Sequence, residues 1–352
     1  MELNNFRNPE LIKKIVTELQ DWKKPVKFME VCGSHTMAIG HWGIRKLLPK
    51  SISLISGPGC PVCVTPSSVV DSLIDLKNVT IATFGDLIRV PGNKGTLEQA
   101  RANGLDVRMV YSPMESLEIA KYKETVLVGI GFETTIPGIA YTILEASRKN
   151  LKNLSILPAF KLVPPALDAL LSSKDMNVDG FILPGHVSVI IGSDAYKSLP
   201  EKFGIGGVVT GFEPLDILIG IKKLIEQIKN NDPKIENEYS RVVTKEGNKQ
   251  AQEIIYKVME VENALWRGLG WIPMSGLSIR EEFSRFDTIK KYGIEITDTE
   301  EQTGCRCGDV LKGKIIPPVC PLFGKACLPN NPIGPCMVSS EGSCAAYYKY
   351  ER

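Results

Sequence analysis

Residues 26–36 read Val26-Lys-Phe-Met-Glu-Val-Cys-Gly-Ser-His-Thr36, and the fold class can be inferred outward from this stretch. Its first six residues include two valines and a phenylalanine, which favour a strand. A turn with glycine and serine follows, and a helical pattern begins near Met37. A strand, a short turn and a helix in this order form the repeating unit of an α/β protein.

The same alternation continues to about residue 230. We expect eight strands, four in each half, at residues 26–31, 52–56, 79–84, 107–111, 125–130, 154–159, 180–183 and 207–210. Helical patterns lie between them, and several open on proline, which suits the first helical turn. These patterns cover residues 66–76, 137–149, 164–171 and 214–228. The sequence therefore predicts an α/β fold with two similar domains, each with a parallel four-stranded sheet and flanking helices.

Four regions are expected along the chain. Residues 1–25 should form an N-terminal helix packed on the C-terminal domain, followed by α/β domains at 26–122 and 123–230. Residues 229–250 are polar and contain proline, which indicates a boundary. Residues 231–352 should then form a smaller, mainly helical and loop domain, which is rich in Gly, Pro and Cys after Cys305.

Composition narrows the function. The chain has 352 residues, of which 43% are hydrophobic and 23% charged, as in soluble globular proteins with two or three domains. A net charge of +2 without a basic, aromatic-rich stripe argues against nucleic-acid binding. The apolar runs are too short to span a membrane, and the polar N-terminus does not look like a signal peptide. We therefore expect a cytoplasmic protein with no nucleic-acid or membrane partner.

The nine cysteines fall into two groups, with none between Cys63 and Cys305. Thiolates are soft ligands for iron and are also the reactive species in disulfide exchange. In a reducing compartment, clustered cysteines more often bind metal or carry electrons than form structural disulfides. The pattern therefore predicts metal handling, redox chemistry, or both.

The first group lies where predicted strands end. Cys32 is placed at the carboxyl edge of a parallel sheet and near a helix N-terminus, which favours a thiolate. His35 is a candidate acid, base or charge partner; the alternative is a buried structural cysteine beside a turn histidine. Cys60 and Cys63 can chelate one ion or close a small disulfide. Neighbouring strands can also bring Cys32, Cys60 and Cys63 together as a three-thiolate metal site.

Other polar residues follow later strands. Glu133 and Thr134 lie at a strand end where they can reach a ligand, and Thr135 can cap the next helix. The surrounding glycines do not complete a dinucleotide-binding fingerprint, because its third glycine is replaced by Thr134. His186 follows another strand, where a lone histidine is more often structural.

The second group contains Cys320, Cys327, Cys336 and Cys344, four thiolates within 25 residues. Four cysteines suit structural zinc or a 4Fe–4S cluster. Cys305 and Cys307 lie just upstream, and such extra thiols favour redox work. These two can form a relay between the sites, or can replace one of the four as ligands.

Together these motifs resemble the HypD family of nickel–iron hydrogenase maturation factors. The resemblance runs from about residue 26 to the end and rests on a set of ordered motifs. They are Cys32-Gly-Ser-His-Thr, Gly57-Pro-Gly-Cys-Pro-Val-Cys, Gly131-Phe-Glu-Thr-Thr, Leu183-Pro-Gly-His-Val-Ser, Cys320-Pro-Leu-Phe-Gly and Gly334-Pro-Cys-Met-Val-Ser-Ser-Glu-Gly-Ser-Cys344.

The resemblance implies a scaffold on which iron acquires two cyanides and one carbon monoxide for the hydrogenase large subunit. It implies the small chaperone HypC and the cyanide donor HypE as partners, and a 4Fe–4S cluster in the C-terminal domain. Carried over by motif, the iron-assembly site would contain Cys32, Cys60 and Cys63, with His35, Thr36, Glu133, Thr134 and His186 beside them. The cluster would be held by Cys320, Cys327, Cys336 and Cys344, with Cys305 and Cys307 as relay candidates.

Such a protein is an assembly scaffold with redox chemistry rather than a conventional turnover enzyme. Two alternatives stay open from the residues alone. One is an iron–sulfur-dependent thiol–disulfide oxidoreductase that reduces a partner through Cys60 and Cys63. The other is an adaptor whose C-terminal cysteines bind structural zinc.

Overall fold

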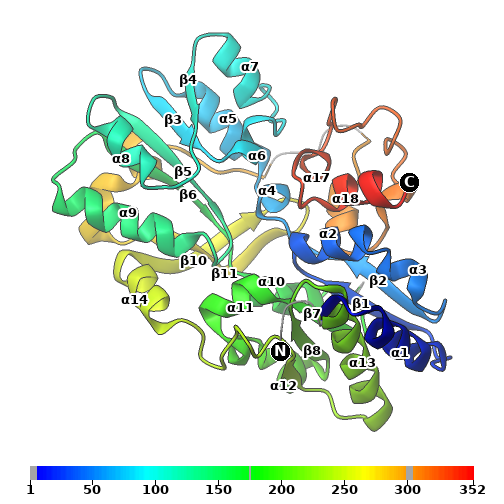
Figure 1. Cartoon of the computed structure of the whole chain (residues 1–352). Helices are drawn as coiled ribbons and strands as arrows, with labels where there is room; N and C mark the ends of the chain where they lie inside the picture. The colour runs from blue at the N-terminus through cyan, green and yellow to red at the C-terminus, as the bar shows by residue number, and fades with distance from the viewer. Residues whose placement is uncertain (1–5, 174–175, 299–303) are drawn as a thin grey trace.

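The structure is a computed structural model that describes residues 6–173, 176–298 and 304–352. Figure 1 shows two α/β units, each built on a parallel sheet, and a C-terminal region that lies beside them. The α/β class and the parallel sheets predicted from the sequence are confirmed.

The first unit contains a five-stranded parallel sheet in the order β2-β1-β7-β8-β9. Its strands are β1 (Val26–Glu30), β2 (Ile52–Ser56), β7 (Gly180–Pro184), β8 (Gly206–Thr210) and β9 (Ile235–Asn237). Side chains alternate between two buried faces: Phe28 and Ile182 belong to one apolar core, whereas Met29 and Phe181 belong to another. Burial on both faces explains why these strands are short apolar runs.

The second unit contains a four-stranded parallel sheet in the order β4-β3-β5-β6. Its strands are β3 (Thr80–Thr83), β4 (Asp106–Met109), β5 (Thr125–Gly131) and β6 (Leu154–Phe160). Every residue of β5 and β6 is buried. An antiparallel hairpin of β10 (Met259–Trp266) and β11 (Gly270–Ile279) packs beside β6.

Helices cover both sheets. In chain order they are α1 (Pro9–Gln20), α2 (Gly33–His41), α3 (Ile44–Leu47), α4 (Pro61–Val64), α5 (Ser67–Asp75), α6 (Gly85–Ile88), α7 (Leu97–Ala102), α8 (Glu115–Ala120), α9 (Ile136–Arg148), α10 (Val163–Leu171), α11 (Gly185–Ile191), η2 (Ser193–Tyr196), α12 (Ser198–Phe203), α13 (Pro214–Asn230), α14 (Lys249–Val258), η3 (Glu281–Phe286) and α15 (Thr288–Tyr292). None of the helices in the described part of the chain is both long and apolar enough to cross a membrane.

The strands were predicted well, but their grouping was not. All eight predicted strands are present, with ends within two residues of the expected ones. They do not, however, form two four-stranded sheets from consecutive halves, 26–122 and 123–230. Instead β1 pairs with β7, so that Phe28 lies beside Gly180, and β9 adds a fifth strand to that sheet. Local patterns specify where strands occur, whereas the choice of neighbour depends on contacts distant in sequence.

The N-terminal helix packs elsewhere than expected. Residues 1–5 lie outside the described residues, and α1 packs on α13 of the first unit rather than on the C-terminal region. Leu19 on its inner face is 2% exposed in the core that α13 shares. The Asn8 side chain caps the helix by accepting from the N–H groups of Glu10 and Leu11.

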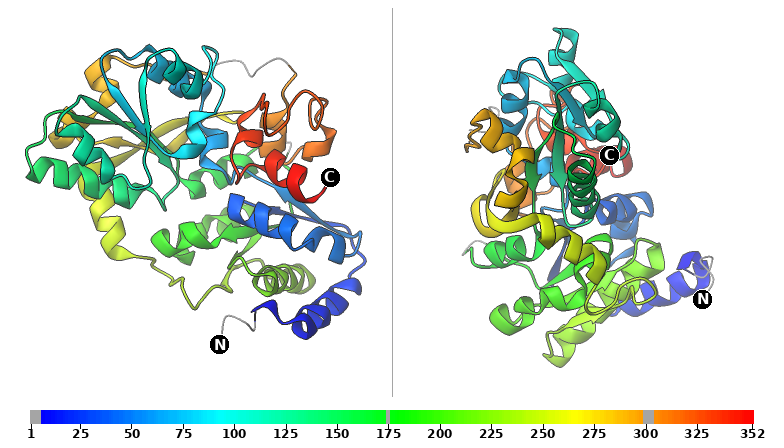
Figure 2. Two further views of the ribbon diagram at one scale, coloured as in Figure 1. Left: turned by 45° about the horizontal axis from the view of Figure 1, so that its top comes forward. Right: turned by 90° about the vertical axis from the view of Figure 1, so that its left-hand side faces the viewer.

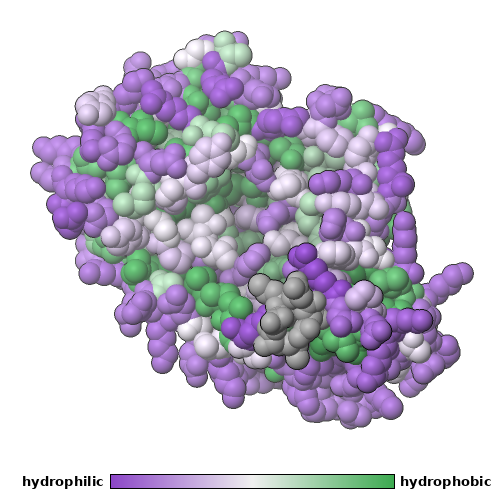
Figure 3. Space-filling view, viewed as in Figure 1, coloured by the Kyte–Doolittle hydropathy of each residue, from purple (hydrophilic) through white to green (hydrophobic). Residues whose placement is uncertain are grey.

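Residues 231–352 do not form one compact domain. β9 belongs to the first sheet, whereas α14 and the hairpin pack on the second unit. Only residues 304–352 have the expected helix-and-loop character, with α16 (Cys307–Leu311), η4 (Pro317–Val319), α17 (Pro335–Val338) and α18 (Ser343–Tyr350). Figure 2 shows α18 lying along α2 of the first unit. Figure 3 shows a mostly hydrophilic rim, with paler and apolar residues gathered toward the middle of this face.

Candidate functional site

Cys32 lies at the carboxyl end of β1, where the chain turns into α2. It is the N-cap residue of α2, which begins at Gly33 and so earlier than the expected Met37. The turn is tight because the Gly33 N–H donates to the Gly59 carbonyl at 2.8 Å. The Cys32 side chain is 8% exposed and is not part of a disulfide. The sequence therefore placed this residue correctly at the sheet edge.

The electrostatics at Cys32 differ from our expectation of a helix-stabilised thiolate. Burial, together with the nearby charge of Glu341, raises the pKa of the Cys32 thiol to about 12. The backbone N–H groups of His35 and Ser34 lower it, but by less. A buried thiol of this kind is protonated at neutral pH and loses its proton when it binds a metal ion.

Cys60 and Cys63 are joined by a disulfide across α4, with their Cα atoms 5.2 Å apart. Both are at most 3% exposed, and the Cys60 sulfur accepts from the Cys63 N–H at 3.1 Å. Of the two possibilities left open, the structure therefore has the disulfide. In this oxidised form two of the three sulfurs of the expected three-thiolate site are bonded to each other, so the site with Cys32 stays a prediction for the reduced protein.

Arg267, in the turn between β10 and β11, holds the disulfide-bearing helix in place. Its N–H donates to the Val64 carbonyl at 2.7 Å, and its Nε donates to the Thr65 carbonyl at 2.9 Å. No local pattern predicts this role, because the contact joins residues 202 positions apart in sequence.

The six C-terminal cysteines line a single cavity. They come from the start of α16, the loops around η4, α17 and the first turn of α18, and they are Cys305, Cys307, Cys320, Cys327, Cys336 and Cys344. The sulfurs of Cys307 and Cys336 lie 2.7 Å apart. Burial and the neighbouring sulfurs together raise the pKa of Cys344 well above its usual range.

The donor set of this cavity fits an iron–sulfur cluster. Among the residues that the structure describes, no three His, Cys, Asp or Glu side chains are arranged to hold a single metal ion. A cluster of several atoms instead needs thiolates spread around a space, as the six sulfurs are here. Besides Cys307 and Cys336, whose sulfurs contact each other, four further cysteines line the cavity, which is the number that a 4Fe–4S cluster needs.

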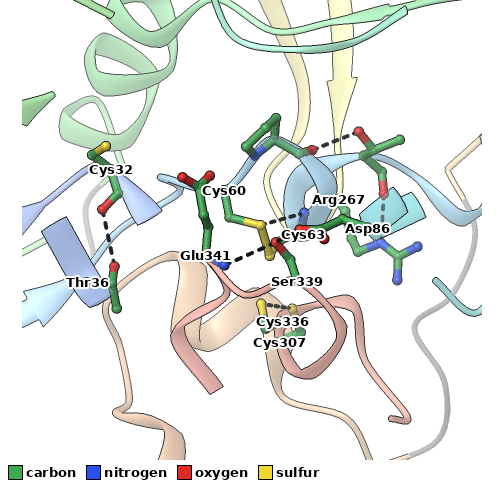
Figure 4. Close-up of a disulfide and its surroundings, with 12 residues drawn as sticks. Cys32, Thr36, Cys60, Cys63, Asp86, Arg267, Cys307, Cys336, Ser339 and Glu341 are labelled. Atoms are coloured by element: carbon green, nitrogen blue, oxygen red, sulfur yellow. Dashed lines mark hydrogen bonds between the residues drawn. A yellow bond between two sulfur atoms is a disulfide. The ribbon is translucent and has the colours of Figure 1, made fainter. Parts of the chain in front are cut away.

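The two cysteine groups meet in one core. Helix α17, which carries Cys336, packs against α4, which carries Cys63, and both residues belong to the same apolar cluster. Figure 4 shows the Cys60–Cys63 disulfide between Cys32 and the pair formed by Cys307 and Cys336. The chain therefore brings together sulfurs that are more than 240 residues apart in sequence.

Glu341 connects the C-terminal region to the Cys32 turn. Its Oε1 accepts from the Ser34 hydroxyl at 2.8 Å, and burial raises its pKa. Two residues earlier, the Ser339 hydroxyl donates to Asp86 of the second unit at 2.8 Å. Glu341 lies within the last motif of the resemblance but was not among the predicted site residues.

His35 and His186 lie on either side of Phe212. The centroid of the Phe212 ring is 4.7 Å from that of His35 and 4.0 Å from that of His186. His35 is fully buried, its Nε2 contacts the Gly211 carbonyl and the Thr210 hydroxyl, and burial lowers its pKa to about 4. This imidazole is therefore neutral at neutral pH, which does not fit a charge partner for Cys32. The imidazole of His186 is exposed.

Thr36 forms hydrogen bonds within the turn that carries Cys32. Its hydroxyl donates to the buried Glu30 carboxylate at 2.8 Å. Burial raises the pKa of Glu30 to about 7, whereas Arg45 at 3.8 Å lowers it. Thr36 is thus a positioning residue beneath Cys32.

The strand end at Glu133 belongs to the second unit. Glu133 is 3% exposed; its Oε1 accepts from the Val163 N–H at 2.9 Å, and its Oε2 has no hydrogen-bond partner among the described residues. Burial raises its pKa to about 7. Thr134 is exposed, and Thr135 occupies the N-cap position of α9 without the expected side-chain hydrogen bond.

Comparison with known proteins identifies the family. A family model described as HypD, Hydrogenase formation hypA family, matches residues 8–351. The hydrogenase maturation factor HypD of Rhodobacter capsulatus is 43% identical over 99% of this chain and 97% of its own. The corresponding protein of Escherichia coli is 41% identical over 99% and 98%, and that of Cupriavidus necator is 40% identical over 99% and 97%. The chain therefore belongs to the HypD family and has a role in hydrogenase maturation.

Proposed function

We propose that this protein is the scaffold on which an iron ion, its cargo, acquires two cyanides and one carbon monoxide before transfer to a hydrogenase large subunit. The observation that carries the proposal is that Cys32 lies near the Cys60–Cys63 disulfide (Figure 4), and that this disulfide shares one apolar core with Cys307 and Cys336 of the cysteine-lined cavity. The free Cys32 thiol at the sheet edge can bind the iron cargo. The sulfurs of the Cys60–Cys63 disulfide and of the cavity cysteines can exchange electrons.

Cys32 is the cargo ligand in this proposal. Its thiol gives up a proton on binding iron, and the soft thiolate donates electron density to the metal. Electron-rich iron binds cyanide and carbon monoxide well. Burial of Cys32 excludes water from the sulfur, while the exposed His186 marks the more open side of the same sheet edge.

The cysteine pairs form a thiol–disulfide relay. A thiolate from Cys307 or Cys336 attacks the Cys60–Cys63 disulfide, and the resulting mixed disulfide is resolved by the other member of the pair. A Cys307–Cys336 disulfide forms, and Cys60 and Cys63 become thiols, so two electrons and two protons move together. The packing of α17 on α4 supports this exchange.

The resident 4Fe–4S cluster is proposed to be held by Cys305, Cys320, Cys327 and Cys344. When bound, the cluster supplies single electrons. Cys305 thereby replaces Cys336 of the sequence-based set, because the sulfur of Cys336 lies against that of Cys307. We expect Cys305→Ser to lose most of the visible cluster absorption, while Cys336→Ser keeps it; the reverse result would restore the original ligand set.

The cargo site is tested by infrared spectroscopy of the protein purified with its small partner. Bands of iron-bound cyanide and carbon monoxide should be present in the wild type and absent in Cys32→Ala, which should also abolish maturation. Cluster absorption should remain in this variant. Normal maturation by Cys32→Ala would remove the proposed role of this cysteine.

Two partners follow from family membership as proposals. The chaperone HypC would receive the cargo at the sheet edge near Cys32, and HypE would supply cyanide there. Deletion of either partner from cells should leave the purified protein without the complete set of infrared bands.

A second candidate function is a partner-directed thiol–disulfide oxidoreductase. It is favoured by the disulfide between Cys60 and Cys63. This function predicts multiple turnovers of disulfide reduction by the purified protein with a reductant, and no iron–cyanide bands in any complex.

A further inference from the structure

The C-terminal region presents cationic side chains beside its cysteine cavity. Residues 304–352 contain six Lys or Arg and three Asp or Glu. All three acids are engaged within the protein: Asp309 pairs with Arg306, Glu341 accepts from Ser34, and Glu351 pairs with Arg45. The charge that this region shows to solvent is therefore predominantly positive.

Arg352 and the loop that carries Lys325 lie near Tyr348, where the loop after Cys320 meets the end of α18. Phe323 lines the cysteine cavity and makes an edge contact with Tyr348 at 6.1 Å between ring centroids. Arg352 lies over the Tyr348 ring at 4.7 Å and donates to its hydroxyl at 2.6 Å. Lys325 follows Gly324, where an added Cβ would lie 4.0 Å from Tyr348.

Lys349 lies on the same helix, with its ammonium 4.9 Å from the centre of the Tyr350 ring. Within the described residues, Lys325, Lys349 and Arg352 form no ion pair with a carboxylate. Val319, next to Cys320, is 57% exposed, and its short helix η4 packs on α18. An exposed apolar side chain on η4, together with cations on and after the helix that η4 packs against, has the composition of a small protein-binding surface.

Through Phe323 this surface adjoins the cysteine cavity, which contains the more exposed sulfurs of the redox centre. Cys305 and Cys344 are only partly buried, whereas Cys60, Cys63, Cys307 and Cys336 are at most 3% exposed. An external donor can therefore approach the sulfur sites more closely at the cavity than at the buried disulfide.

We infer that the surface formed by Val319, Lys325, Tyr348, Lys349 and Arg352, the cavity-side surface, docks an acidic one-electron carrier protein. The inference rests on the proposed redox function, for which this carrier protein is the reductant. Reduction of the Cys60–Cys63 disulfide to two thiols takes two electrons and two protons. Two successive one-electron oxidations of the carrier supply the electrons, and solvent supplies the protons. Opposite surface charges steer such short-lived encounters.

The test is binding of a purified acidic 2Fe–2S ferredoxin to the full-length protein, measured by calorimetry at several salt concentrations. The affinity should fall at least about tenfold in the double variant Lys325→Glu and Lys349→Glu, and it should fall with ionic strength. The matched control reverses two exposed lysines on α1 and α13, Lys13→Glu and Lys229→Glu, and should bind as the wild type does.

A kinetic measurement separates this inference from the function on which it rests. The cavity-side double variant should be reduced normally by dithionite but slowly by reduced ferredoxin. If the protein contains no cluster, the redox function fails, and the binding result still stands by itself. Equal ferredoxin affinity in wild type and double variant would overturn the docking surface, as would no binding at all. The docking surface would also be overturned if a basic cytochrome bound as tightly as ferredoxin, or if duplex DNA or anionic vesicles bound more tightly than ferredoxin.

Discussion

At the scale of single residues, Cys32 shows how two opposing effects are weighed. A helix N-terminus stabilises a nearby anion by about 0.3–1 kcal/mol. Burial and Glu341 raise the pKa of this thiol from 9.0 to about 12, which corresponds to about 4 kcal/mol. The position of Cys32 was predictable from strand and turn patterns. Its protonation state was not, because it depends on burial in the folded protein and on the charge of Glu341, which is distant in sequence.

Glu133 provides a pH-dependent prediction. Its pKa is about 7 in the folded protein against an ordinary value of 4.5, because burial disfavours the charged carboxylate. The folded state then holds a proton that the unfolded chain has lost, so the free energy of unfolding should fall as pH rises from about 4.5 to 7. The contribution of Glu133 to this loss is about 3 kcal/mol.

Chemical denaturation at several pH values tests this expectation. Glu133→Gln should gain stability relative to the wild type between pH 5 and pH 8, because the amide does not titrate. The exposed Glu201→Gln is the control and should run parallel to the wild type. A difference between Glu133→Gln and wild type that does not vary with pH would show that the carboxyl is not perturbed.

At the scale of elements, local sequence patterns were sufficient to locate a helix or strand whose position depends on contacts between residues close in sequence. Apolar runs located β2 at residues 52–56, and Pro214 located the start of α13. The short helix α4 was missed, since four residues give no helical period. Its position depends on Arg267 from a distant hairpin, which no local pattern reports.

The turn that carries Cys32 and the turn that carries Cys60 pack so closely that no side chain should fit between them. A Cβ at Gly59 would lie 2.3 Å from the backbone nitrogen and 2.6 Å from the Cα of Cys32. Gly59→Ala should therefore cost about 2–3 kcal/mol of unfolding free energy and increase alkylation of Cys32. The control is Gly138→Ala in α9, where the nearest atom is 3.6 Å away; it should stabilise by up to about 1 kcal/mol. Equal stability of both variants would contradict this close approach.

At the scale of the whole molecule, the arrangement of the parts could not be read from the sequence. Each half of the chain contributes strands to the five-stranded sheet, and the cysteine-rich region meets both units through Ser34 and Asp86. The motifs selected the candidate site residues, because each follows a predicted strand or lies in a cysteine-rich loop. The pairing of Cys307 with Cys336 required the folded structure.

The docking of the C-terminal region depends on Arg45. Its guanidinium pairs with Glu351, lies 4.6 Å from the centre of the Tyr347 ring and is 3.8 Å from the buried Glu30. Arg45→Ala would leave Glu30 without its countercharge and remove two contacts to α18 and its C-terminal end. The free energy of unfolding should fall by about 3 kcal/mol. Hydrogen exchange of α18 should accelerate, while that of β5 and β6 stays slow.

The control is Lys94→Ala, because the ion pair of Lys94 with Asp75 is more than half exposed. This variant should change the free energy of unfolding by less than about 0.5 kcal/mol. Unchanged exchange of α18 in Arg45→Ala would mean that apolar packing on α2 alone holds the cysteine-rich region against the Cys32 turn.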